Sequence, residues 1–417
     1  MKPITIAIAG CGSRGQDTYA ACQKRFPDRM KIVAAADIRP EKLRQMQENY
    51  GLTHDQCYDS AESMLQAGRL ADIMIIATPD RMHYMEAMEA LKLDYHLLLE
   101  KPIAPTAEEC TAIEKLALER NREVVVCHVL RYTVFYQKLK ELVDSGLVGE
   151  VMNIQAIERV GYWHQAHSFV RGNWRNSDET TPMILQKCCH DMDILLWLSG
   201  KSCKRVTSFG HLSHFTPEHA PEGAPLRCTD GCPAADTCPY NAMRFYLDPV
   251  EGKPSWATFV MSAPTEEGIM EELRTGRYGR CVYHCDNNVV DHQVVNLEME
   301  DELTVSFTMT AFTKECARNM RIMGTSGEIW ADMEENIIKV MPFRGETQVI
   351  DVRTLTNDFS GHAGGDTRMI GDLLHLLRDG ERSSALTSID RSVESHVVAL
   401  AAEESRKNGG RVIELKA

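Results

Sequence analysis

Three glycines near the start of the chain have the spacing of a phosphate-binding turn. Residues Ile4–Ala9 form an apolar run with β-branched residues, typical of a buried parallel strand, and lead directly into Gly10, Gly12 and Gly15. In such a turn the first glycine allows a tight bend, the second lets the backbone approach a pyrophosphate, and the third lets the next helix pack on the strand. The amides of that helix's first turn can then hold the phosphate charge. The pattern predicts a dinucleotide site.

An acidic residue follows the second predicted strand, at residues 31–36. Asp37 comes directly after it, where a carboxylate would accept hydrogen bonds from an adenosine ribose and repel a 2′-phosphate. This favours NAD over NADP. Arg39 is a counter-signal, because a guanidinium two residues further on could accept the extra phosphate. We interpret Arg39 instead as a solvated charge at the start of a helix that begins at Pro40.

Strands and helices alternate regularly after this point. Further apolar strands are predicted at 71–78, 95–99 and 123–127, and helices at 40–50, 60–67, 82–91 and 106–120. Pro79 would end the strand at 71–78, which places Thr78 and Pro79 in a ligand-facing loop at the carboxyl end of the sheet. The alternation predicts an α/β fold with a doubly wound parallel sheet, a Rossmann domain over residues 1–127.

The composition limits the kind of protein. A chain of 417 residues is long enough for two or three domains. Its net charge of −14 at pH 7 argues against nucleic acid or an anionic membrane as a partner. It has no run of about 18 apolar residues, and it begins without the layout of a signal peptide. We therefore expect a cytoplasmic protein that does not enter a membrane.

The pattern changes after residue 127. Residues 135–145 are predicted as a helix closed by Gly146, and residues 151–159 alternate in polarity as a half-buried strand does. A long helix at 390–408 and a short strand at 411–415 end the chain. The prediction is a second domain over residues 128–417 with a Cys-rich insertion around 203–285. Its other strands, expected to share one broad sheet, are 289–299, 303–311, 319–324, 328–331 and 337–341.

Motifs along most of the chain resemble those of one known family. Glu100-Lys101-Pro102 follows Ala77-Thr78-Pro79 and precedes His128-Val129-Leu130-Arg131-Tyr132. Together with residues 146–150, Trp174-Arg175, His190–Asp193 and residues 396–401, these motifs resemble the Gfo/Idh/MocA family of sugar and cyclitol oxidoreductases. The resemblance implies a Rossmann domain, a C-terminal α/β domain with a large, open, mostly antiparallel sheet, and homodimers or homotetramers formed through that sheet. It also implies a Pro102 that is often cis and aims Lys101 into the cleft.

The resemblance gives chemical roles to two side chains. Oxidising a sugar hydroxyl needs a hydride acceptor, a base for the hydroxyl proton, and a group that stabilises the developing oxyanion. Lys101 can donate a hydrogen bond to the reacting oxygen, and His190 is the candidate base. Many relatives also carry an aspartate four residues before this histidine, on the same helix face, but here the residue is Gln186. Glutamine can form a hydrogen bond but holds no charge.

The missing aspartate leaves alternatives open. Lys101 and His190 suffice, or Asp191 or Asp193 substitutes, or the net reaction is not a simple dehydrogenation. Lys187, next to Gln186, faces elsewhere if the segment is a helix. The catalytic residues are therefore predicted as Lys101, His190 and Gln186. The predicted NAD-binding residues are Gly10, Gly12, Ser13, Arg14, Gly15, Asp37, Thr78, Pro79, His83, Glu100 and Lys101.

A segment just before the catalytic helix is rich in sugar-binding residue types. Between 162 and 175 it combines aromatic rings that can stack on a pyranose with His, Asn and Arg hydrogen-bonding groups. Arg171 and Arg175 could clamp an acidic sugar, or they could pair with Asp178 or Glu179. The predicted substrate-binding residues are Arg131, Tyr162, Trp163, His164, His167, Arg171, Trp174, Arg175 and Asp193.

Three cysteines lie within a Pro- and Gly-rich part of the insertion. Cys228, Cys232 and Cys238 could hold a structural zinc ion if a fourth ligand is supplied. The alternative is free or locally packed thiols. The candidates for the fourth ligand are Cys203, His211, His214, His219 and Cys285.

Three functions remain in competition at this point. The leading prediction is an NAD-dependent oxidoreductase that acts on a hydroxyl of a sugar, a sugar derivative or a cyclitol. The second is an NAD-dependent glycoside hydrolase that works by transient oxidation, elimination, hydration and re-reduction. The third is a non-catalytic NAD-binding sensor or scaffold, whose binding of the nucleotide would survive Lys101→Ala.

Overall fold

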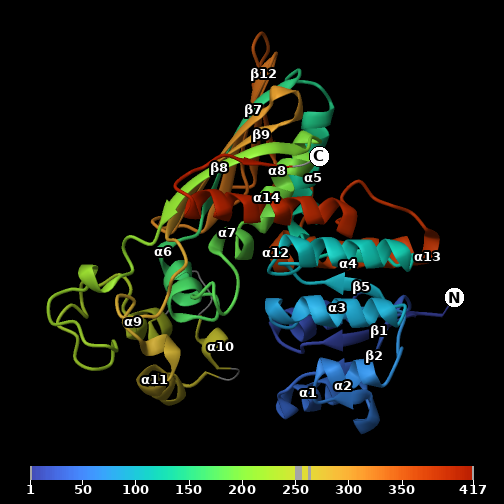
Figure 1. The fold of residues 1–417 in the computed structure, drawn as a ribbon, viewed down its shortest axis with the longest axis vertical. Helices are drawn as coiled ribbons and strands as arrows, with labels where there is room; N and C mark the ends of the chain where they lie inside the picture. The colour runs from blue at the N-terminus through green and yellow to red at the C-terminus, as the bar shows by residue number, and fades with distance from the viewer. Residues whose placement is uncertain (1, 249–255, 262–263, 416–417) are drawn as a thin grey trace.

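Two β-sheets, one above the other along the long axis, form the framework of the molecule (Figure 1). The computed structural model describes residues 2–248, 256–261 and 264–415. The lower sheet and its helices come from the N-terminal part of the chain, and the upper sheet comes from the C-terminal part. None of the helices in these described ranges is both long and apolar enough to cross a membrane.

The lower sheet confirms the predicted doubly wound parallel architecture. Its strands are β1 (Ile4–Ala9), β2 (Met30–Ala36), β3 (Cys57–Tyr58), β4 (Ile73–Ile76), β5 (His96–Leu99) and β6 (Val124–Val126). They run parallel in the order β3-β2-β1-β4-β5-β6, and β4 is buried along its whole length. Strands covered by helices on both faces need such continuous apolar sequence. The helices are η1 (Ser13–Tyr19), α1 (Pro40–Tyr50), α2 (Ala61–Gln66), α3 (His83–Lys92) and α4 (Ala107–Glu119).

Helix α4 shows how local sequence determines where a helix begins and which of its faces is buried. Thr106 caps its first turn by accepting a hydrogen bond from the Glu109 amide, and the Glu109 side chain accepts the Thr106 amide in return. Cys110, Ile113 and Ala117 then recur at helical spacing and are buried against the sheet.

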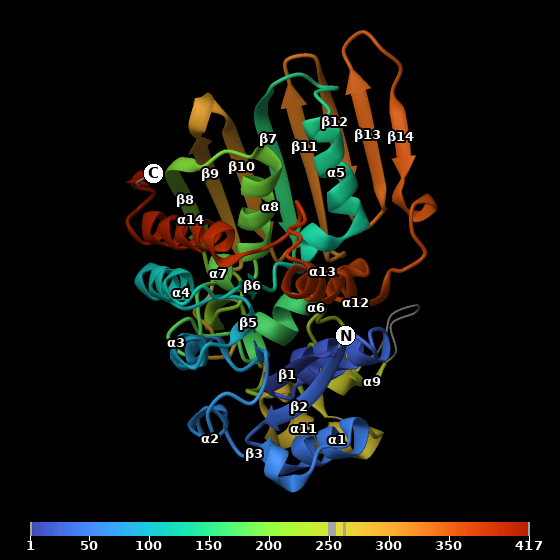
Figure 2. The same ribbon diagram turned by 90° about the vertical axis from the view of Figure 1, so that its right-hand side faces the viewer.

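The upper sheet has nine strands and is mostly antiparallel, as predicted. Its order is β14-β13-β12-β11-β7-β10-β9-β8-β15, in which β7 and β10 run parallel. Helices α5 (Val134–Asp144), α8 (Cys189–Ser199) and α14 (Ile389–Lys407) lie on one face of it (Figure 2). The strands are β7 (Val151–Arg159), β8 (Cys203–His211), β9 (His292–Met299), β10 (Thr304–Thr310), β11 (Ala317–Gly324), β12 (Gly327–Asp332), β13 (Ile337–Pro342), β14 (Gln348–Asp351) and β15 (Ile413–Glu414).

One helix returns from the C-terminal part of the chain to the N-terminal sheet. Helix α13 (Gly365–Asp379) was not predicted from sequence. Its Met369 and Leu373 are buried in the same core as Ile6 and Ile8 of β1. A segment inside the predicted second domain, 128–417, therefore completes the core of the first.

The cysteine-rich insertion is shorter at its start than predicted. Residue 203 begins β8, which pairs with β9 along the upper sheet, so the chain leaves the sheet only after residue 211. From there to β9 the chain carries α9 (Ala242–Leu247), α10 (Ala257–Val260) and α11 (Glu266–Thr275). In Figure 1 these helices lie to the left of the N-terminal domain, and in Figure 2 α9 and α11 lie behind it.

Candidate active site

The glycine turn leaves no room for side chains at two positions. Gly10 has φ +86°, and a Cβ built on it would lie 2.5 Å from the Ala77 carbonyl oxygen. A Cβ on Gly15 would lie 1.9 Å from the Gly10 carbonyl oxygen. Gly12 is open, with nothing nearer than an Arg39 nitrogen at 3.7 Å. This close-packed turn at the start of η1 fits the pyrophosphate of a dinucleotide, which needs bare backbone.

We expect Gly15→Ala to weaken NAD binding about 10- to 100-fold, because overpacking at such a contact costs about 1–3 kcal/mol. Titration of nucleotide fluorescence would measure this change. Gly371→Ala is a matched control, since its Cβ would meet Phe26 at an ordinary 3.4 Å. A Gly15→Ala protein that binds NAD as tightly as the wild type would contradict the assignment of this turn.

Arg39 is an exposed charge at the start of α1, as the sequence suggested, and its guanidinium also pairs with Asp37. Its Nε and Nη2 donate to the two carboxylate oxygens of Asp37, at 3.0 and 3.1 Å. Burial opposes ionisation of Asp37, but the hydrogen bonds from Arg39 and from the Cys11 amide hold the pKa of the carboxyl below its usual value. Since Asp37 stays negative beside the open Gly12, it is placed to meet a ribose.

Arg14 links the glycine turn to the residue before Lys101. Its Nε donates to Glu100 at 2.6 Å, and its Nη2 donates to Asp366 of α13 at 2.8 Å. Glu100 also accepts the Lys101 amide at 3.0 Å. Burial raises the cost of charge on Glu100, yet Arg14 and Lys101 keep its pKa below the usual value. Arg14 and Glu100 thus hold the turn in place, while Ser13 lies exposed at the start of η1.

Two other predicted cofactor residues bind the protein itself. Thr78 donates its hydroxyl to Glu86 at 2.6 Å, and burial raises the pKa of Glu86 to about 7. The His83 ring lies between the carbonyl oxygens of Thr78 and Pro102, at 2.9 and 2.7 Å. His83 therefore joins the loop at Thr78-Pro79 to the loop that carries Lys101.

The three predicted catalytic residues meet at the boundary of the two domains. The Lys101–Pro102 peptide is cis, and Lys101 Nζ donates to the Gln186 main-chain oxygen at 3.1 Å. Burial, reinforced by the nearby charge of Lys101, lowers the pKa of His190 well below its usual value. The predicted single helix is wrong, because the chain breaks after α7 (Met183–Gln186) and restarts as α8 at Cys189.

Both aspartates that could substitute for a carboxylate at 186 are paired with an arginine. Asp191 accepts Arg318 at 2.8 Å, and Asp193 accepts Arg131 at 2.7 and 2.5 Å. All four side chains are largely buried. Lys187 faces away from the cleft, as expected, and pairs with Glu158 at 3.2 Å.

Four residues of this region were not predicted as site residues, although His128 and His396 lie in motifs used for the resemblance. Asp80 and Thr181 are joined by a 3.1 Å hydrogen bond between the domains. The His128 ring lies 5.6 Å from His190 and 5.4 Å from His396, between centroids. Asp80 directly follows the Thr78-Pro79 pair, and this position at a strand end could have identified it.

The structure does not bring the predicted substrate residues to one surface. Trp174 is 40% exposed, whereas His167 stacks on Tyr278 and bonds to Tyr246 at 2.7 Å. Arg175 forms ion pairs with Asp286 and Glu179. Tyr162, Trp163 and His164 form α6, where the Trp163 and His164 rings stack. Among Arg131, Arg171 and Arg175, no guanidinium is left without partners in the described residues.

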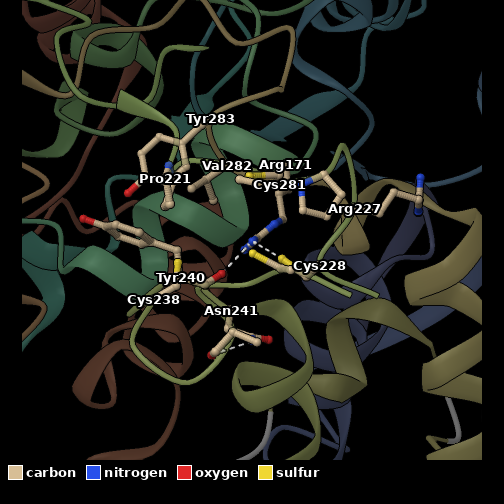
Figure 3. A pocket seen from close by; sticks show the side chains of 14 residues that line it. Arg171, Pro221, Arg227, Cys228, Cys238, Tyr240, Asn241, Cys281, Val282 and Tyr283 are labelled. Atoms are coloured by element: carbon tan, nitrogen blue, oxygen red, sulfur yellow. Dashed lines mark hydrogen bonds between the residues drawn. The ribbon is translucent and has the colours of Figure 1, made fainter. Parts of the chain in front are cut away.

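Arg171 lies inside the insertion (Figure 3). It donates to the carbonyl oxygens of Arg280 and Tyr240, at 2.7 and 2.6 Å, and to the Cys228 sulfur at 3.7 Å. The pocket around it is also lined by Cys232, Cys238 and Cys281. Within the part of the chain that is described, no group of three or more His, Cys, Asp or Glu is arranged to hold a metal, so the zinc prediction has no support.

We expect Arg171→Met to lower the free energy of unfolding by about 2–4 kcal/mol, because two buried carbonyl groups lose their donor. Chemical denaturation and limited proteolysis of the insertion would report this loss. Arg274→Met, on the exposed side of α11, is the control. If Arg171→Met were as stable as the wild type but bound sugar more weakly, Arg171 would instead be a substrate-binding residue, as predicted from sequence.

Two models of known protein families together match most of the chain. Residues 4–128 match the model described as oxidoreductase family, NAD-binding Rossmann fold. Residues 136–330 match the GFO/IDH/MocA C-terminal domain. The chain belongs to the Gfo/Idh/MocA family. It is an NAD-binding oxidoreductase, as the motifs around Lys101 predicted.

Other members of the Gfo/Idh/MocA family match to different extents. The oxidoreductase YteT of Bacillus subtilis is 23% identical over 88% of each chain. Inositol 2-dehydrogenase of Burkholderia ambifaria is 28% identical over 48% of this chain and 55% of its own. 2,7-anhydro-N-acetylneuraminate hydratase of Escherichia coli is 27% identical over 39% and 43%. An inositol dehydrogenase homolog from Azotobacter vinelandii, solved with NAD+, superimposes with TM-score 0.70, 15% identity and coverage of 99% and 98%.

Proposed function

We propose that this oxidoreductase removes hydrogen from a secondary hydroxyl of a sugar, a sugar derivative or a cyclitol. The observation that carries the proposal is the meeting of Lys101, Gln186 and His190 at the domain boundary, beside the loops that the glycine turn and His83 hold in place. The inositol 2-dehydrogenase relative supports a polyol substrate.

The chain supplies the groups that such a reaction needs. NAD+, when bound, supplies the hydride acceptor. The Lys101 ammonium donates a hydrogen bond to the substrate oxygen and stabilises the negative charge that develops there. His190 is neutral at physiological pH because its pKa is lowered, so a ring nitrogen can take the hydroxyl proton. Asp37 and the turn at Gly12 would hold the adenosine end of the dinucleotide.

The decisive experiment measures NADH absorbance with a panel of substrates. The purified protein is incubated with NAD+ and myo-inositol, D-glucose, D-glucuronate or methyl β-D-glucoside, and product release is followed in parallel. The proposal expects stoichiometric NADH and ketone with at least one free sugar or cyclitol. If none of them gives NADH and no product is released, despite tight NAD binding, the proposal is overturned and the non-catalytic function is favoured.

A second candidate is a reaction in which NAD is oxidant and reductant in turn. The uncharged Gln186 and the hydratase relative favour it. Glycoside cleavage by transient oxidation, elimination, hydration and re-reduction would release free sugar without accumulating NADH. The methyl glucoside in the same panel separates the two reactions.

We also propose that the open face of the upper sheet forms a homodimer or homotetramer contact. Phe209 of β8 and Val294 of β9 are 52% and 40% exposed, on adjacent strands. Neighbouring apolar side chains of this kind favour a protein contact. Light scattering would give the mass in solution, and a monomer would remove the proposal.

A further inference from the structure

A hydrogen-bonded chain joins Gln186 to a carboxylate of the other domain. The Thr181 hydroxyl lies 3.2 Å from the Gln186 side-chain oxygen and 3.1 Å from Asp80 Oδ2. Asp80 belongs to the loop that follows β4, whereas Thr181 and Gln186 precede α8. Each of the three residues is no more than 6% exposed.

Asp80 has polar contacts but no cationic partner. Its other oxygen accepts the Arg81 amide at 3.1 Å. Within the described ranges of the chain, no Lys or Arg nitrogen pairs with it. A buried carboxylate without an ion pair is costly, and it is found where its charge is used.

The chemistry of the three groups explains a glutamine at 186. The Thr181 hydroxyl has one proton, and both groups that face it are acceptors. Two carboxylates on this hydroxyl would repel each other, and one would be forced to take up a proton. A neutral carboxamide at 186 avoids this conflict. Asp80 is then the one acidic side chain on this hydroxyl, two hydrogen bonds away from position 186.

We propose that Asp80 is a positioning residue that acts through Thr181. It provides the carboxylate that position 186 lacks, and it keeps the Thr181 hydroxyl in place beside the Gln186 side chain. The amide nitrogen of Gln186, which no other described residue accepts, is then turned to the substrate as a donor. This inference rests on the proposed dehydrogenase function.

The test is a set of five variants with the panel sugar that gives the most NADH. Asp80→Asn and Thr181→Val should each lower kcat about 10- to 100-fold, with NAD affinity unchanged. The Asp80→Asn/Thr181→Val double variant should be no slower than either single variant, because both break the same chain. Gln186→Asp alone should be slow, whereas Asp80→Asn/Gln186→Asp should recover to within about 5-fold of the wild type, because one charge is restored.

Glu89→Gln is the control, since it removes one exposed carboxylate from the same domain. Unfolding midpoints of all variants separate a folding defect from a catalytic one. The role of Asp80 is overturned if Asp80→Asn turns over like the wild type, or if adding Gln186→Asp to it gives no recovery. A wild-type protein that reduces no NAD+ with any sugar overturns the proposed function itself, and this role with it.

Discussion

Lys101→Met should lower kcat about 1,000-fold and leave NAD binding nearly unchanged. The ammonium group is the donor that stands at the domain boundary, held by the Gln186 carbonyl at 3.1 Å. A methionine side chain has a similar length and cannot donate. Stopped-flow measurement of NADH formation gives the rate, and nucleotide titration gives the affinity.

Lys92→Met is the matched control for this experiment. Lys92 lies at the end of α3, is half exposed and pairs with Glu89. Its loss removes the same charge from the same domain without touching the cleft. If Lys101→Met kept more than about a tenth of the wild-type rate, another group would have to stabilise the developing charge and take part in the proton transfer.

His190→Asn should lower kcat about 100- to 1,000-fold and remove the acid limb of the pH profile. The pKa of His190 is depressed by burial, by Lys101 and by His128. A base with a depressed pKa is available above that pKa and is lost only as pH falls through it. In the wild type, activity should therefore hold as pH is lowered through 6.5 and fall only well below it.

His375→Asn, at an exposed position on α13, is the control for the histidine substitution. Histidine NMR adds a readout that does not need turnover. In Lys101→Met the pKa of His190 should rise, because one of the charges that disfavour the imidazolium is gone. An acid limb near pH 6.5 in the wild type, or a His190 titration unaffected by Lys101→Met, would contradict this description of the base.

The parts of the fold that sequence predicts are those whose partners are close in the chain. The predicted strands of the first sheet are short apolar runs, and all five are found, whereas the two-residue strand β3 was not predicted. Helix α13 was missed, although its Met369, Leu373 and Leu376 recur on one face. The core that they join includes residues of η5 (Val129–Tyr132) and of β1, which are distant from α13 in the sequence. Strand β14 was missed because Gln348 and Val349 are exposed and do not alternate.

The residues of the candidate site also differ in whether their contacts could be predicted from the sequence. Local sequence alone predicted the glycine turn, whereas the roles of Lys101 and His190 came from the resemblance to the Gfo/Idh/MocA family. The roles of the arginines depended on pairings that sequence does not show. Asp193 and Arg131 are 62 residues apart, and Arg171 and Arg280 are 109 apart. Arg171 lies in a segment rich in sugar-binding residue types, but its hydrogen bonds are made within the insertion.

The packing of α13 in the core of the first sheet affects when this domain can fold during synthesis. The glycine turn leaves the ribosome long before α13, whose side chains join β1 in one buried core. The core of the nucleotide-binding half is therefore completed only after α13 has been synthesised. A fragment that stops near residue 128 would lack this part of the core, so we expect it to aggregate.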